Sequence, residues 1–138
     1  MMIEVELYQI VITDGVDTQV IVLKERQGER QLPIFIGANE ARAIERKLKD
    51  VPVPRPLTHD LTVDIVGKLG GAISRVVIND LRDETYFASI EINQAGKIRE
   101  IDARPSDAVA LAVRGAVPMF VEEFVFERTN KAPDFTKL

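Results

Sequence analysis

The residues best suited to chemistry in this sequence lie at the starts of three expected helices. At such starts, free backbone N–H groups and the positive end of the helix dipole favour anions, phosphate above all. The polar residues at these starts are Glu40; then Arg55, His59 and Asp60; and then Asp102, Arg104, Ser106 and Asp107. If the three starts converge, they would combine carboxylates for a cation, guanidinium groups for phosphate charge and an imidazole for proton transfer. Metal-assisted cleavage of a phosphodiester bond requires those groups.

Each group takes a role under this hypothesis. Asp102 and Asp107, with Glu40, would hold a magnesium or manganese ion. The expected catalytic set is His59, Asp60, Asp102 and Asp107. The expected phosphate-binding set is Arg55, Arg104 and Ser106, with the basic helical stripe Arg42, Arg46 and Lys49 steering a nucleic-acid strand. Oxygen ligands are expected because the chain has no cysteine and one histidine, and no organic cofactor is expected.

The same residues also have purely structural interpretations. Ser106 and Thr58 suit helix caps, and Asp60 and Asp107 suit the helix dipole without any metal. Asp102 with Arg104 could be an ion pair at the strand–helix corner, and His59 a half-buried surface histidine. The basic stripe could be a solvated helix face, with Glu45 and Lys49 as a helical ion pair.

The central segment, residues 100–115, predicts a strand that runs directly into a helix. Pro105 suits the first helical position, or Ser106 caps the helix, which moves the boundary by one residue. From Ala108 to Val113 every residue is apolar, so we expect a buried helix. Gly115 is expected to supply the left-handed stop.

The periodicity of apolar residues and the positions of turn residues predict the remaining strands and helices. The expected strands are 3–13, 18–24, 31–36, 72–81, 84–93, 97–103 and 117–126. The expected helices are 37–48 and 58–69, besides the central one. Their expected buried faces are Ala41, Ile44 and Leu48 in the first, and Leu61, Ile65, Val66 and Leu69 in the second. The predicted fold class is α+β, a mainly antiparallel sheet or two small sheets with three helices packed against it.

Length and charge limit the protein's class. A chain of 138 residues suits one domain, expected over residues 1–128, with a loosely held tail over 129–138. No apolar run approaches the roughly 20 residues that cross a bilayer, and the N-terminus does not resemble a signal peptide, so we expect a cytoplasmic protein that does not bind membranes. With a net charge of −4, binding to nucleic acid would need a local basic patch.

Three segments resemble the bifunctional nuclease domain family. They are residues 32–37 with Glu40 and Ala41, residues 54–61, and residues 102–108 with 110–112. They occur in the family's order, and the resemblance extends over residues 3–123. It implies an α+β domain that self-associates and cleaves phosphodiester bonds in both DNA and RNA.

Two functional hypotheses follow. The first is a divalent-metal-dependent nuclease with little sequence preference, acting on DNA, RNA or both. The second is a non-catalytic oligomeric module for binding or regulation, in which the polar corners are structural and exposed apolar surface forms subunit contacts. The acidic net charge and the single histidine favour the second hypothesis.

Overall fold

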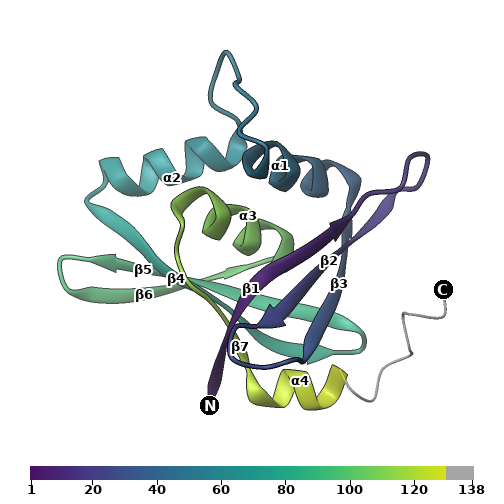
Figure 1. Ribbon diagram of the computed structural model, residues 1–138. Coiled ribbons are helices and arrows are strands. Elements are labelled where there is room, and N and C mark those ends of the chain that lie inside the picture. The colour runs from purple at the N-terminus through teal and green to yellow at the C-terminus, as the bar shows by residue number, and fades with distance from the viewer. Residues whose placement is uncertain (130–138) are drawn as a thin grey trace.

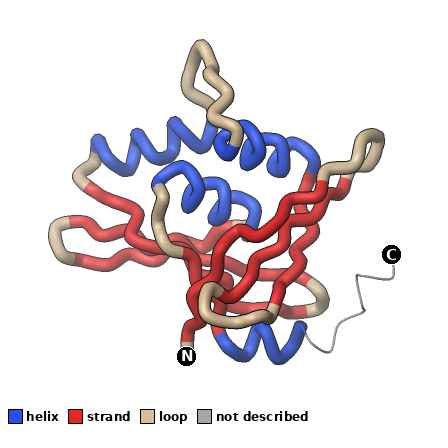
Figure 2. Tube along the Cα trace, viewed as in Figure 1, coloured by secondary structure: helices blue, strands red, loops and turns tan. Residues whose placement is uncertain are grey.

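The structure is a computed structural model that describes residues 1–129. Within that range, one mixed sheet of seven strands is covered by four helices (Figures 1 and 2). The α+β class and the single unit are therefore as predicted, and the two-sheet alternative is wrong. Every strand pair is antiparallel except one, β4 with β7.

The strands lie in the order β3-β2-β1-β7-β4-β5-β6. Their bounds are β1 Met2–Val11, β2 Thr18–Glu25, β3 Gln31–Gly37, β4 Gly71–Arg82, β5 Thr85–Gln94, β6 Lys97–Ala103 and β7 Met119–Glu122. The short β7 joins the two antiparallel halves, since it pairs with β1 on one side and β4 on the other. Only this long-range pairing merges the halves into one sheet.

The helices are α1 Ala38–Leu48, α2 Thr58–Lys68, α3 Pro105–Gly115 and α4 Glu123–Thr129. The central helix α3 lies between the sheet and the layer formed by α1 and α2, while α4 lies at the other end of the sheet, beside the N-terminus (Figure 1). Residues Ala108 to Ala112 of α3 are all buried, as their unbroken apolar run predicted. This sandwiched helix carries residues of the candidate site at its start.

Several local predictions were wrong. The expected strand 117–126 is the strand β7 followed by the helix α4, because Val125 and Phe126 enter the core from a helix. The left-handed residue after α3 is Ala116, with φ 52°, whereas Gly115 is still helical. Arg104 occupies the N-cap position of α3 and Pro105 its first turn, so Ser106 is a buried helical residue and no cap.

The predicted buried face of α2 is wrong for three of its four residues, because only Val66 packs, partly buried, against the core. Leu61, Ile65 and Leu69 are exposed by 51%, 49% and 70%, and α2 has no buried residue. They follow an i, i+4, i+8 spacing and form an apolar stripe on the outer side of the helix, which we call the α2 stripe. On α1, Ala41 and Ile44 are buried as predicted, but Leu48 is half exposed.

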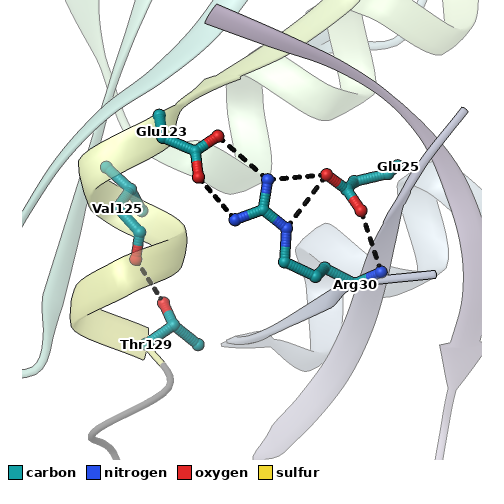
Figure 3. Close-up of polar contacts among 5 residues, drawn as sticks. All are labelled: Glu25, Arg30, Glu123, Val125 and Thr129. Atoms are coloured by element: carbon teal, nitrogen blue, oxygen red, sulfur yellow. Dashed lines mark hydrogen bonds and ion pairs between the residues drawn. The ribbon is translucent and has the colours of Figure 1, made fainter. Parts of the chain in front are cut away.

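An ion cluster attaches α4 to the β2–β3 hairpin (Figure 3). Arg30 donates to Glu123 at 2.6 and 2.9 Å and to Glu25 at 2.7 and 3.0 Å, and its guanidinium lies 4.6 Å from the centre of the Phe126 ring. These hydrogen bonds raise the pKa of Arg30 and lower the pKa of both Glu25 and Glu123. Residues distant in sequence are thus joined by charge-assisted bonds.

At the end of α4, Thr129 is buried and donates to the carbonyl of Val125 at 2.8 Å, and it lies 3.0 Å from the Tyr86 hydroxyl. Residues 130–138, the rest of the expected tail, lie outside the described residues. Within residues 1–129, no helix is both long enough and apolar enough to cross a bilayer.

Candidate functional site

The starts of α2 and α3 meet through one hydrogen bond. His59 Nε2 lies 2.9 Å from Asp107 Oδ1, although the two residues are 48 positions apart. The imidazole is largely enclosed, with 13% of its side chain exposed, while Asp107 is a third exposed. Both sit in the first turn of their helices, where the sequence predicted chemistry.

Arg104 extends this pair toward α1. Its Nε donates to Asp107 Oδ2 at 3.0 Å, and its Nη1 donates to Glu40 Oε1 at 3.3 Å. The four residues therefore form a continuous chain, Glu40–Arg104–Asp107–His59, which we call the polar chain. The sequence hypothesis required the three helix starts to converge, and one residue or more from each start lies in this chain.

The electrostatics of the polar chain keep Asp107 ionised. Burial raises the pKa of Asp107, but the hydrogen bonds from His59 and Arg104 outweigh it, so the net pKa is below the ordinary value of 3.8. The hydrogen bond to Asp107 is in turn the largest cause of a raised pKa for Arg104. An ionised carboxylate only accepts hydrogen bonds, so the proton between it and His59 belongs to Nε2.

Asp60 lies in a separate pair with Arg114. Arg114 Nε donates to Asp60 Oδ1 at 2.7 Å, and the backbone N–H of Leu57 donates to Oδ2 at 3.0 Å. The Leu57 bond and then the Arg114 bond lower the pKa of Asp60. Asp60 thus has its oxygens occupied at the start of α2, away from the His59 ring contact.

Asp102 and Ser106 also stand apart from the polar chain. Asp102 is exposed on β6, opposite Ser89, and its side chain forms no hydrogen bond or ion pair with any residue of the range 1–129. Ser106, in the first turn of α3, is only 6% exposed, so it does not face the solvent.

The predicted basic residues have different surroundings. Lys49 lies 3.6 Å from Glu45, as the structural interpretation of the stripe expected, and Arg42 lies 3.5 Å from Asp14. Arg46 is half buried, and its Nε has no partner among the described residues. Arg55 is exposed in the loop between α1 and α2 and also forms no polar contact within the described part of the chain.

The donors predicted to hold a metal do not form an open set of oxygens. Glu40 and Asp107 share the guanidinium of Arg104, which already supplies the positive charge between them. Asp102 is outside this contact. Within residues 1–129, no group of three or more histidine, aspartate or glutamate side chains could hold a metal ion. We therefore derive no chemical step through a metal from this arrangement.

Sequence reasoning missed the role of Arg114. Its side chain is only 7% exposed and pairs with Asp60. Its spacing does carry a signal, because seven residues after Asp107 is two helical turns and hence the same face of α3. That signal cannot be used until the partner helix is known to cross this face.

The class of protein that this fold and site define is an α+β domain with polar residues gathered at its helix starts. The chain is a member of the bifunctional nuclease domain family, whose model matches residues 21–134. The resemblance seen in the sequence is thereby confirmed. The match includes every residue of the polar chain.

The relatives of this chain include a mycobacterial protein and several plant proteins. A Mycobacterium tuberculosis protein, named as uncharacterized, is 42% identical over 127 residues, which are 92% of this chain and 76% of the relative. Bifunctional nuclease 1 of Arabidopsis thaliana is 29% identical over 109 residues, 76% of this chain and 34% of the plant protein. Bifunctional nuclease 2 of Oryza sativa subsp. japonica is 31% identical over 105 residues, 73% and 32% respectively. This chain thus spans about a third of the plant proteins' length.

Proposed function

We propose that this chain hydrolyses phosphodiester bonds of DNA and RNA with little sequence preference and that His59 is its general base. The observation that carries the proposal is the 2.9 Å hydrogen bond between His59 Nε2 and Asp107 Oδ1. Family membership and the names of the plant relatives support the class of reaction.

The His59–Asp107 pair has the arrangement of an oriented base. Since Asp107 holds the proton on Nε2, the lone pair of the neutral ring is on Nδ1. Nδ1 forms no hydrogen bond with any described residue, so it is available to a reactant. It would take a proton from water as the water oxygen bonds to phosphorus, while the bond from phosphorus to the leaving oxygen breaks and that oxygen takes a proton from solvent. Water must be the nucleophile for DNA, which has no 2′-hydroxyl.

Arg104 is suited to stabilise charge on the phosphate. Its Nε and Nη1 are held by Asp107 and Glu40, and its Nη2 has no partner within residues 1–129. The side chain is well exposed, so Nη2 can donate to a non-bridging phosphate oxygen. Arg55 would contribute from the loop, and the exposed Arg42 and Lys49 would steer the strand.

A divalent cation remains a prediction from the sequence. Glu40 and Asp107 carry oxygens of the type that magnesium and manganese prefer, and both bond Arg104 in this arrangement. Assays with EDTA, magnesium and manganese test this separately from the role of His59. The predicted cytoplasmic location likewise stays a prediction.

The test is cleavage of end-labelled single-stranded DNA and RNA by the wild type and by His59→Gln. Loss of the general base is expected to lower the rate roughly 10²–10⁴-fold. Lys68→Gln, an exposed change on the same helix, is the matched control and should keep the wild-type rate. An unchanged rate in His59→Gln would refute the role of His59, and a wild type without cleavage under any metal condition would refute the nuclease.

The second candidate is a non-catalytic oligomeric module, and the α2 stripe favours it. Three large apolar side chains exposed along one helix are typical of an interaction surface. Self-association through this stripe is compatible with either function. Binding of a nucleic acid without turnover would select the second candidate.

A further inference from the structure

A pocket of about 250 Å³ is lined by Asp60 and Arg114 but by no residue of the polar chain, and it belongs to no step of the proposed hydrolysis. Its walls are the end of α1, the loop 49–57, the start of α2 and Arg114 near the end of α3. That loop projects between α1 and α2 at the top of Figure 1. These walls place the pocket on the helical side of the molecule.

The charge of the pocket lining is positive. Arg46, Lys47 and Arg114 bring three positive charges, and Asp50 and Asp60 bring two negative ones. Asp60 is paired with Arg114, and Lys47 lies 3.9 Å from Asp50. Arg46 is thus the lining cation that has no carboxylate partner within residues 1–129.

Two buried donors in this lining are unpaired. Arg46 Nε and Arg114 Nη1 are both hidden from solvent and have no hydrogen-bond partner among the described residues. A buried guanidinium donor without an acceptor is costly, and native proteins rarely leave one. Both donors belong to cations that line the same pocket, Arg46 from α1 and Arg114 from α3. One ligand rich in oxygen acceptors could pair with both.

We propose that this pocket binds a phosphate group. A tetrahedral phosphate presents several oxygens and full negative charge, which match two guanidinium groups better than a neutral ligand does. The proposal rests on the proposed function in one respect: it takes the phosphate to belong to a nucleic-acid strand. Arg114 lies seven residues after Asp107 on α3, about 10 Å along the helix, a distance that a strand of a few nucleotides spans.

The test is calorimetric titration with inorganic phosphate and with the thymidine dinucleotide, with and without a 5′-phosphate. The wild type should bind one phosphate per chain and prefer the phosphorylated dinucleotide. Arg46→Gln should weaken phosphate binding about tenfold or more, since it removes the unpaired cation. Arg26→Gln, the same change at an exposed arginine outside the lining, is the matched control and should bind as the wild type does.

A second variant, with thermal unfolding, distinguishes a loss of phosphate binding from a loss of folding. Arg114→Lys keeps a positive charge for Asp60 but removes Nη1, and it should also weaken phosphate binding; thermal unfolding reports whether each variant is folded. The phosphate site would be overturned if the wild type showed no saturable binding of phosphate. It would also be overturned if Arg46→Gln and Arg114→Lys bound phosphate as tightly as the wild type does. These readouts need no turnover. A protein that binds phosphate through Arg46 but cleaves nothing would retain this site and lose the nuclease proposal.

Discussion

His59 and Asp107, from the first turns of two different helices, are joined by a hydrogen bond of 2.9 Å. Asp107 also accepts from Arg104 through its other oxygen, Oδ2, so each carboxylate oxygen is held by a different side chain. The pair orients an imidazole whose second nitrogen is available to substrate. The functional predictions depend on this relationship.

Asp107→Asn should remove the orientation of His59 while preserving side-chain volume. An amide can donate to Nε2, which moves the ring proton to Nδ1 and abolishes the base. Cleavage should fall roughly 10²–10⁴-fold, measured on labelled DNA and RNA. Asp64→Asn on the exposed side of α2 is the matched control. If Asp102→Asn proves as damaging as Asp107→Asn, the metal role predicted from the sequence is favoured over the oriented base.

Acid should weaken the cluster around Arg30. The pKa of Glu123 is lowered in the folded protein, so its contribution is fully present above the ordinary value of 4.5 and is lost as pH falls through the folded pKa. The Tm of Glu123→Gln should lie about 3 °C below that of the wild type at pH 7. The difference should shrink below pH 4.5. Glu127→Gln, exposed on the same helix, should show no such pH-dependent gap.

Substitutions of the buried and the exposed apolar residues of α1 should lower the free energy of unfolding by different amounts. Ile44 is fully buried, so Ile44→Ala should lower the free energy of unfolding by about 2–5 kcal/mol. Leu48, half exposed on the same helix, should lose under about 1 kcal/mol on the same change. Urea unfolding measures both. Equal losses would mean that Leu48 is covered, for example by another subunit.

Glycine should stabilise the end of α3. Ala116 adopts φ 52°, a left-handed conformation that burdens any residue with a Cβ. Ala116→Gly is expected to raise the free energy of unfolding by about 1 kcal/mol. Ala112→Gly, the same chemical change inside the helix, should lower it by about 1 kcal/mol or more. If urea unfolding showed that both variants change the free energy of unfolding in the same direction, the left-handed conformation of Ala116 would be contradicted.

The α2 stripe should control self-association if it is a subunit contact. Ile65→Lys places a charge in the middle of the stripe and should convert an oligomer to a monomer, as measured by light scattering after size exclusion. Because Ile65 is half exposed, the folded monomer should survive. Leu48→Lys, equally exposed on α1, is the control. A wild-type monomer, or an unchanged mass for Ile65→Lys, would exclude the stripe as the contact.

Much of the fold was predicted from local patterns in the sequence. The central helix was recognised because Pro105 and an unbroken apolar run leave few alternatives, and β6 was predicted with its observed bounds. The α2 stripe was misjudged because periodicity defines an apolar face but does not say whether that face meets the core. The end of the chain was misjudged because Glu123, Phe124 and Val125 suit a strand as well as a helix until Arg30 and the core are in place.

The sequence by itself determined the family, the α+β class and the placing of polar residues at helix starts, because each depends on residue types within short segments. The tertiary structure decided which of those residues meet. Only the packing of α1 and α2 over α3 brings Glu40, Arg104, Asp107 and His59 into one chain, and only that packing diverts Asp60 to Arg114. Hydrogen bonds act over about 3 Å, and neighbours at that scale are set by how helices cross.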